Sequence, residues 1–258
     1  MDIEPLRAFE DNYIWLITRD DTDACAVVDP GDEEPVISVL EKRDLRLTSI
    51  LVTHKHYDHT GGIDALKKRY PGVEVFGPGN ESISQISRSV EDHQQISLPG
   101  MNLDFEVLSI PGHTEGHVAY LGNGVLFCGD TLFAGGCGRV FTGTFEQMSA
   151  SLDRIRKLPP ETQLYCAHEY TQANVGFGLW VEPQSEVLKQ RQQSVEAAVE
   201  QAIPTVPSSL QQELDTNPFL RVEQQNVISA AEQWAGRPLN NNAEVFTALR
   251  RWKDRDYD

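Results

Sequence analysis

The sequence predicts an α/β layered domain followed by a smaller helical domain. Over the first 175 of its 258 residues, short apolar runs of strand character alternate with segments of helical periodicity. This alternation is typical of sheets that are covered by helices. After about residue 175 the strand pattern stops and amphipathic helical segments follow. We therefore expect two domains, 1–175 and 176–258.

Turn residues delimit the predicted elements of the first domain. The β-rich runs at 13–18 and 24–28 are separated by polar residues, and the second run ends at the turn signal 29–32. Residues 144–147 have the form of a capping box, which predicts that a helix begins there. The pattern also predicts helices at 36–40 and 61–70, and strands at 49–52, 73–76, 105–110, 117–121, 125–128 and 163–166.

The last 80 or so residues are predicted to be helical. Within 183–202, the apolar residues Val187, Val195, Val199 and Ala202 fall on one helical stripe, with Gln, Glu and Lys opposite. We expect this stripe to be the buried face. Three shorter helices are predicted at 210–214, 228–234 and 245–252.

The composition excludes several classes of partner. The formal net charge is −17, and such an excess of carboxylates repels nucleic acids and anionic membranes. No apolar run approaches the roughly 20 residues that cross a bilayer, and the N-terminal residues do not have the pattern of a signal peptide. The four cysteines are widely and irregularly spaced, which indicates free thiols in a reducing compartment. We expect a cytoplasmic protein.

The segment 53–59 packs three histidines and one aspartate directly behind a predicted strand. Alternate side chains of an extended segment share a face, so we expect His54, His56 and Asp58 on one side, with His59 brought round by a turn. Four ligands would overfill one catalytic site, which must keep a coordination position open. The cluster therefore predicts two adjacent metal ions. Imidazole and carboxylate together suit zinc, iron or manganese.

Three further residues follow predicted strands in the same way: His113, Asp130 and His168. Alone, each would be read as a hydrogen-bonded loop residue. Beside the 53–59 cluster, each becomes a candidate ligand, since loops at one end of a layered sheet converge. We expect His93 to be solvated, and His117 to support a ligand or the fold rather than to bind metal.

Together these segments resemble the metallo-β-lactamase superfamily. The resemblance implies an αββα sandwich, in which two mixed sheets lie back to back with helices outside. It implies one metal ion held by His54, His56 and His113, a second held by Asp58, His59 and His168, and Asp130 as the bridge between them.

Five more segments resemble glyoxalase II, the hydroxyacylglutathione hydrolase family: 9–13, 135–139, 168–171, 217–221 and 250–254. The resemblance implies hydrolysis of S-D-lactoylglutathione and other S-2-hydroxyacylglutathiones to glutathione and a 2-hydroxy acid, the second step of methylglyoxal detoxification. Two metal ions would convert a bridging water into the attacking hydroxide, and Asp58 would orient it. The implied substrate-binding residues are Arg139, Phe141, Tyr170, Asn174, Arg250 and Lys253.

The chemistry of the basic C-terminal segment agrees with this reading. Glutathione carries two carboxylates, and Arg250 and Lys253 share one helix face at spacing i, i+3. The alternative is a solvated helix end, where the helix dipole favours cations. Family members often carry Lys at the position of Arg139, which keeps the charge. They often carry Tyr at the position of Phe141, and its absence removes a hydroxyl that could bond the substrate.

Other functions remain open at this point. A mononuclear iron dioxygenase acting on glutathione persulfide shares the fold and the histidine cluster. A phosphodiesterase or nuclease is disfavoured by the net charge of −17. A metal-binding protein without catalytic activity would have filled sites but no turnover. Two divalent ions per chain are expected, zinc first, with iron or manganese as alternatives. By analogy with the family, we expect a monomer.

Overall fold

The computed structural model describes residues 1–257 and divides into two compact units. The first unit comprises Met1–Ser109 and Gly116–Gly129, and the second comprises Ile110–Glu115 and the chain from Asp130 onward. The first unit contains a six-stranded mixed sheet in sequential order. The first three strands pair antiparallel and the last four pair parallel. The strands are β1 (Asp2–Ala8), β2 (Asn12–Thr18), β3 (Ala24–Val28), β4 (Arg46–Leu51), β5 (Glu74–Pro78) and β6 (Arg88–Val90).

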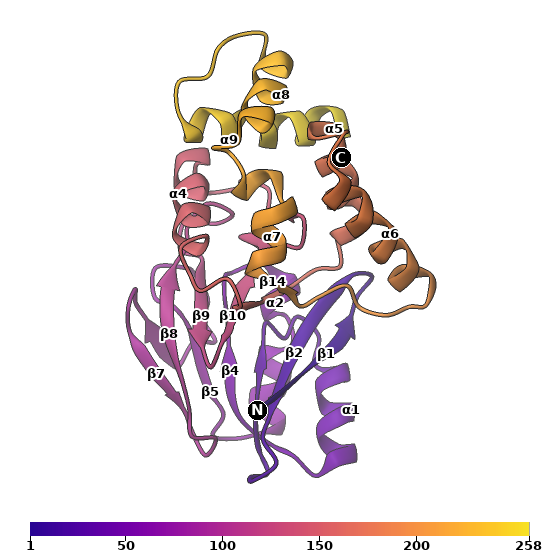
Figure 1. Cartoon of the computed structure of the whole chain (residues 1–258). Coiled ribbons are helices and arrows are strands. Elements are labelled where there is room, and N and C mark those ends of the chain that lie inside the picture. The colour runs from indigo at the N-terminus through magenta and orange to yellow at the C-terminus, as the bar shows by residue number, and fades with distance from the viewer. Residues whose placement is uncertain (258) are drawn as a thin grey trace. The chain divides into compact units, whose positions relative to one another are not determined.

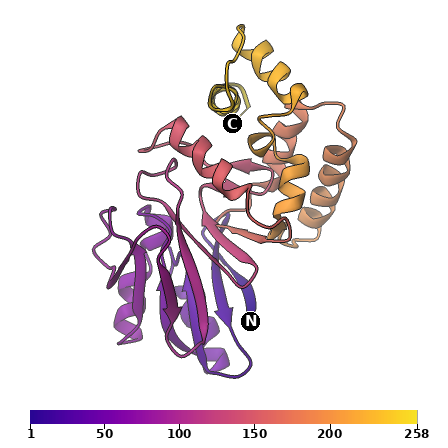
Figure 2. The same cartoon turned by 60° about the vertical axis from the view of Figure 1, so that its left-hand side comes forward.

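Two helices cover one face of this sheet, α1 (Glu34–Arg43) and α3 (Ile63–Arg69) (Figures 1 and 2). Their buried residues join one apolar cluster with alternate residues of the strands, among them Leu16, Val27 and Ile50. Side chains alternate across a strand, so the remaining residues of each strand face the other side. The sheet therefore has two buried faces, and β2 and β3 are buried along their whole length.

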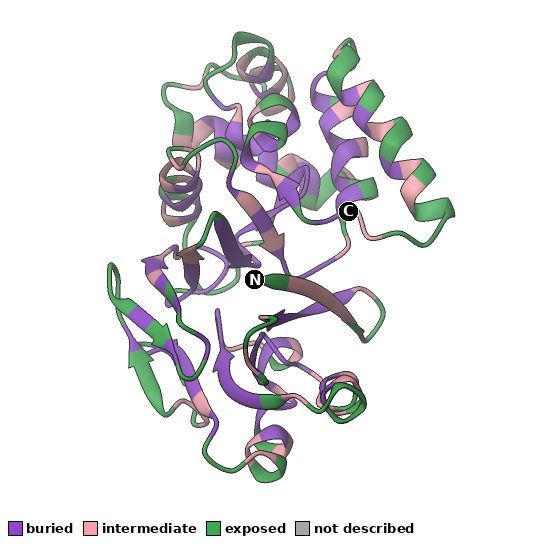
Figure 3. Cartoon of the chain, turned by 60° about the horizontal axis from the view of Figure 1, so that its bottom comes forward, coloured by how far each residue is buried: buried purple, intermediate pink, exposed green. Residues whose placement is uncertain are grey.

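A second, antiparallel group of strands lies in the same unit: β7 (Gln95–Leu98), β8 (Leu103–Ser109), β9 (Val118–Gly122) and β10 (Val125–Gly129). Tyr120 of β9 donates its hydroxyl to the carbonyls of Val52 (2.8 Å) and Phe76 (3.3 Å), which ties this group to β4 and β5. The outer strand β7 alternates exposed and buried residues (Figure 3), as expected of an edge strand with one solvated face.

The second unit consists mainly of helices, which Figure 2 shows gathered in the orange to yellow part of the chain. Its strands are β11 (Leu132–Phe133), β12 (Gly136–Cys137), β13 (Gln163–Cys166) and β14 (Ser208–Ser209). Its helices are α4 (Phe145–Ile155), α5 (Thr171–Val181), α6 (Glu186–Glu200), α7 (Leu210–Thr216), α8 (Gln225–Ala235) and α9 (Asn242–Trp252), with short helical turns at Pro218–Leu220 and Lys253–Tyr257.

Several predicted elements are confirmed. The strands at 24–28 and 163–166 have the predicted bounds. Thr144 caps α4 through a complete capping box, because its hydroxyl accepts from Gln147 N (3.1 Å) and its backbone N–H donates to Gln147 Oε1 (2.9 Å). The predicted boundary near residue 175 stays a prediction.

The stripe predicted for 183–202 is confirmed at Val195, which is buried, and wrong at Val187, Val199 and Ala202. Val187 and Val199 of α6 are exposed, and the buried residues of that helix are Leu188, Arg191 and Val195. Arg191 is buried because it forms an ion pair with Glu213 of α7. Within the described part of the chain, no helix is both long enough and apolar enough to cross a membrane.

Candidate metal centre

The parallel pair β3 and β4 places two polar segments at the same sheet edge, since parallel strands end on the same side. Asp29 directly follows β3, and the 53–59 segment follows β4. Asp29 is buried, and its two carboxylate oxygens accept from the backbone N–H and the hydroxyl of Thr53, each at 2.8 Å. Asp29 Oδ2 also lies 3.0 Å from His59 Nδ1. One carboxylate thus anchors both ends of the histidine segment.

These contacts determine which nitrogens can bind a metal. A carboxylate oxygen only accepts, so the shorter of the two carboxylate contacts of His59, the one at Nδ1, favours the proton on Nδ1 and the lone pair on Nε2. The hydroxyl of Thr53 donates to Asp29, so it accepts from Nδ1 of His54, 3.0 Å away. His54 therefore also carries its lone pair on Nε2. That nitrogen lies 3.0 Å from His56 Nδ1, an approach that suits two ligands of one cation.

The extended geometry predicted for this segment is wrong beyond His56. A short helix, α2 (Tyr57–Thr60), begins there, and His56 is its extended N-cap. Asp58 and His59 therefore project from a helical turn. His59 Nε2 lies 3.3 Å from Asp58 Oδ2, and that same oxygen accepts from the side-chain amide of Asn12 (3.0 Å).

Sequence reasoning missed Asp29 and Asn12 as members of the site. Asp29 directly follows a strand, as Asp130 does, but it lies inside a turn signal, so the sequence indicates only a turn there. Asn12 lies within a family-like segment, although its bond to Asp58 spans 46 residues. The role expected for His117 matches its position: it is fully buried, and its ring stacks on that of His54 with centroids 4.7 Å apart. His93 is exposed, as predicted, and pairs with Glu106.

The second unit contributes His113, Asp130 and His168, all of them buried. The Nε2 atoms of both histidines lie 3.4 Å from Asp130 Oδ2. The Nδ1 of His113 donates to the carbonyl of Arg139 (2.8 Å), which leaves the lone pair on the nitrogen that faces Asp130. Two imidazoles around one carboxylate oxygen form a typical ligand arrangement for a divalent ion.

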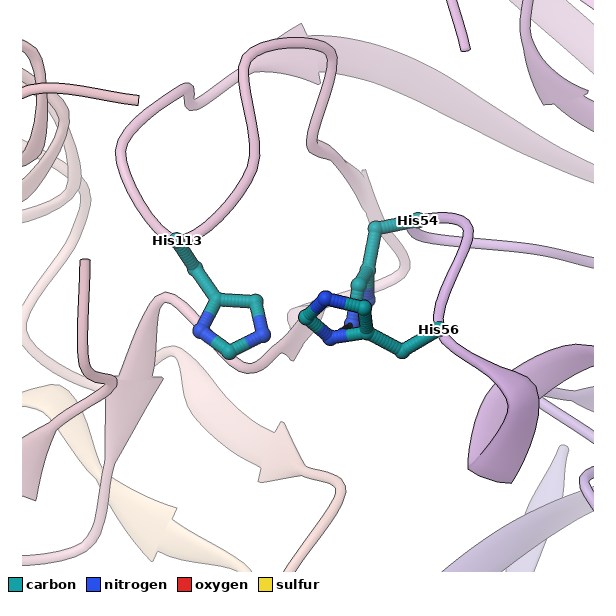
Figure 4. Close-up of side chains that lie close together, drawn as sticks. All are labelled: His54, His56 and His113. Carbon is teal, nitrogen blue, oxygen red and sulfur yellow. Dashed lines mark hydrogen bonds between the residues drawn. The ribbon is translucent and has the colours of Figure 1, made fainter. Parts of the chain in front are cut away.

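Each unit thus holds its own group of ligand-type side chains: His54, His56, Asp58 and His59 in the first, and His113, Asp130 and His168 in the second. Figure 4 shows the imidazoles of His54 and His56 lying together, with 3.0 Å between His54 Nε2 and His56 Nδ1. The donors are imidazole nitrogens and carboxylate oxygens, and most of them are buried. A buried donor set of this kind fits zinc, iron or manganese. Clusters of this kind indicate a binuclear metal site.

A cavity of about 470 Å³ opens beside His113 and Asp130 in the second unit. This volume is typical of a site for a small molecule. Its lining includes all six residues that were predicted to bind substrate: Arg139, Phe141, Tyr170, Asn174, Arg250 and Lys253.

The two predicted cations of α9 and its C-terminal turn are buried rather than solvated, with Arg250 1% exposed and Lys253 5% exposed. The guanidinium of Arg250 donates to the carbonyl of Cys137 (2.8 Å) and pairs with Asp254 (2.9 Å). Burying a charge is costly unless it is paired. The pairing with Asp254 offsets this cost for Arg250, and both cations line the same cavity, where an anionic group could reach them.

Two aromatic members of the lining contact candidate ligands. Tyr170 stacks on His168, with ring centroids 4.8 Å apart and planes at 5°. Phe141 is 61% exposed, and its ring meets that of His113 edge-on at 5.2 Å.

Comparison with known proteins places the chain in a family. Residues 8–168 match the model of the metallo-beta-lactamase superfamily, and residues 169–256 match that of the hydroxyacylglutathione hydrolase C-terminus. The hydroxyacylglutathione hydrolase of Photobacterium profundum is 50% identical over 252 residues, 98% of each chain. The crystal structure of ETHE1 from Myxococcus xanthus covers 100% of this chain and 93% of its own with a TM-score of 0.70, at 24% identity. TTHA1623 in a di-iron-bound form covers 64% of this chain and 91% of its own, with a TM-score of 0.54 and 27% identity.

The two sheets and the His/Asp clusters define a metallohydrolase of the metallo-β-lactamase fold, and the predicted fold class is confirmed. Within that class, the chain belongs to the hydroxyacylglutathione hydrolase family. The likeness to ETHE1 shows the fold alone, because the identity is only 24%.

Proposed function

We propose that this enzyme hydrolyses S-D-lactoylglutathione and related S-2-hydroxyacylglutathiones. Water adds to the thioester carbonyl, the C–S bond breaks, and the products are glutathione and a 2-hydroxy acid, D-lactate for the lactoyl substrate. As part of this proposal, the reaction is the second step of methylglyoxal detoxification. The relatives named hydroxyacylglutathione hydrolase support this substrate class.

One observation carries the proposal: the same cavity is lined by two candidate metal ligands and by two buried cations. His113 and Asp130 line it together with Arg250 and Lys253. A glutathione thioester has a reactive carbonyl that needs polarising and carboxylates that need cations. A guanidinium binds a carboxylate through parallel hydrogen bonds, and an ammonium binds as a point charge. The lining of this cavity therefore matches both chemical features of such a substrate.

We assign the ligands as the sequence predicted. His54, His56 and His113 would hold one divalent ion, Asp58, His59 and His168 would hold the other, and Asp130 would contact both. The tautomers support this assignment, because the lone pairs inferred for His54, His59 and His113 all lie on Nε2. When bound, divalent ions lower the pKa of water and polarise a carbonyl oxygen.

The side chains supply orientation and binding. Asn12 donates to Asp58 Oδ2 (3.0 Å) and so fixes the plane of the carboxylate that we propose orients the nucleophile. Arg139, Arg250 and Lys253 would bind the carboxylates of the tripeptide, and Asn174 would bond its backbone. Tyr170 and Phe141 would cover the thioester beside His168 and His113. Because Phe141 has no hydroxyl, it would contribute contact area only.

The test combines thiol release with elemental analysis of the purified chain. We expect about two divalent ions per chain and release of one thiol per S-D-lactoylglutathione consumed. Oxygen uptake with glutathione persulfide, without thioester hydrolysis, would instead support a dioxygenase. Filled metal sites with neither activity would indicate a binding protein.

We further propose zinc as the first metal to test, with iron or manganese as alternatives. The di-iron form of TTHA1623 is a reason to include iron. The four cysteines are buried free thiols, which supports a reducing, cytoplasmic compartment. A monomeric chain with domains at 1–175 and 176–258 completes the proposal.

A further inference from the structure

The turn at residues 133–136 joins β11 to β12 and forms part of the cavity wall. Besides the backbone pairing of β11 with β12, the polar side chains of Asn174, Glu213 and Asn217 hold its backbone. The contacts are Asn217 Nδ2 to the carbonyls of Phe133 (3.3 Å) and Gly136 (2.9 Å), Asn174 Nδ2 to the carbonyl of Ala134 (3.1 Å), and the N–H of Gly135 to Glu213 Oε2 (2.7 Å).

We call the side chains of Asn174, Glu213 and Asn217 the clamp. The turn needs glycine at two positions to fit against it. Gly135 has φ +71°, in the left-handed region that favours glycine. A Cβ on Gly136 would lie 2.4 Å from the amide carbon of Asn174. The two glycines therefore allow the close approach between the backbone of the turn and the clamp.

Glu213 of α7 is the buried centre of the clamp, with an exposed fraction of 0%. Its two oxygens have different partners. Oε2 accepts from Gly135 N and from Asn217 Nδ2 (3.1 Å), whereas Oε1 accepts from the guanidinium of Arg191. Hydrogen bonds to an ionised acceptor are stronger than neutral ones, so Glu213 holds the turn more firmly than the two amides do.

The 133–136 turn also supports the groups that we propose bind substrate. Just after it, the carbonyl of Cys137 accepts from Arg250 (2.8 Å). At its start, the ring of Phe133 meets the rings of His168 and Tyr170 edge-on, with centroids 5.8 and 5.3 Å apart. A shift of the turn would therefore move the guanidinium and both rings together.

We propose that Glu213 is a positioning residue of the substrate cavity: through the 133–136 turn it sets the place of Arg250 without touching the substrate. This inference rests on the proposed function for the role of Arg250. Arg250 binds parts of the substrate that do not react, so its displacement weakens ground state and transition state equally and raises KM rather than lowering kcat.

A purely structural role is the competing explanation, and the chain offers a matched control. Glu182 is also buried, at 4% exposure, and forms a bidentate pair with Arg221 (2.9 and 3.0 Å). Its hydrogen bonds run to Arg221 and Asn226, outside the turn. Glu182→Gln should therefore cost stability in the same way as Glu213→Gln but leave the turn in place.

The experiment compares the wild type with Glu213→Gln, Glu213→Asp and Glu182→Gln in metal-loaded full-length chains of equal metal content. In Glu213→Gln the amide oxygen stays with Arg191, so the amide nitrogen opposes the N–H of Gly135. We expect faster hydrogen exchange at the Gly135 amide and an increase of about tenfold in KM and in the Kd for glutathione, as for a binding group displaced by a fraction of an ångström. Glu213→Asp keeps the charge but shortens the reach, and we expect a smaller change in the same direction.

Glu182→Gln should lower Tm without changing KM or the Gly135 exchange rate. The proposal is overturned if the Glu213 variants fold with KM and glutathione Kd within twofold of wild type, or if neither folds while Glu182→Gln does. Absence of thioester hydrolysis by the wild type would instead refute the proposed function, and glutathione binding and Gly135 exchange would still decide the role of Glu213.

Discussion

Replacing Asp29 by Asn tests whether one carboxylate organises the histidine segment. Asp29 accepts two hydrogen bonds from Thr53, each at 2.8 Å, and its Oδ2 lies 3.0 Å from His59 Nδ1. An amide of the same shape has only one acceptor oxygen. If that oxygen keeps the hydroxyl of Thr53 and His59, the amide nitrogen faces the backbone N–H of Thr53. The loss of one bond and the opposed donors would cost roughly 2–4 kcal/mol.

That cost should appear mainly as weaker metal binding, because Asp29 fixes the tautomer of His59 directly and that of His54 through Thr53. Loss of such support typically lowers metal affinity about 10–100-fold. We expect Asp29→Asn to lose metal at correspondingly lower chelator concentrations, and excess metal to restore part of the turnover. Thr53→Val serves as a control that cuts the link to His54 but spares the contact between Asp29 and His59. An Asp29→Asn chain that holds both ions as tightly as the wild type would refute the reasoning.

Three further predictions concern the metal, the substrate and the buried thiols. Asp130→Ala should abolish turnover and lower the metal content, since both buried histidines around it lose their shared partner at 3.4 Å; full activity in a metal-free preparation would contradict the scheme. Arg250→Ala should raise KM about tenfold or more, near the value of one charge-assisted hydrogen bond, with little change in kcat in steady-state assays. Burial raises the pKa of Cys137 to about 11 and that of Cys166 to about 12. Because both folded-state pKa values lie above those of unfolded thiols, their contribution to stability is complete below about pH 8.5 and is lost as the pH rises toward 11–12; Tm should fall over that range, and a flat profile would count against it.

The elements that sequence could predict are those whose burial is visible locally. The runs at 24–28 and 163–166 are short, apolar and bounded by turns, and both strands have the predicted bounds. The strand β1 was missed, because an outer strand with mostly half-exposed residues and a proline has no apolar run. The helix α5 was missed for the opposite reason. It contains Gly176 and Gly178 and is buried on several sides, so it shows no clear amphipathic stripe.

Residues whose role depends on a distant partner could not be recognised. Arg191 reads as a solvated position of an amphipathic helix, and only its contact with Glu213, 22 residues away, explains its burial. The same holds for Asp29 and Asn12, whose bonds to Thr53 and Asp58 span 24 and 46 residues. The candidate ligands were predictable because histidine and aspartate are metal-binding residue types and their spacing in the sequence is typical of ligands. The groups that orient those ligands have ordinary residue types, and only the fold brings them to the site.

The negative net charge of the chain opposes the binding of an anionic substrate, and the lining of the cavity compensates for it locally. A net charge of −17 repels an anionic tripeptide at long range. Exposed cations would be a poor remedy, since salt screens their charge. Arg250 and Lys253 are instead nearly inaccessible and line a cavity of about 470 Å³. Their attraction for a carboxylate acts at short range, where water is largely excluded and electrostatic interactions are stronger. Selectivity for an anionic substrate can therefore coexist with a strongly acidic chain.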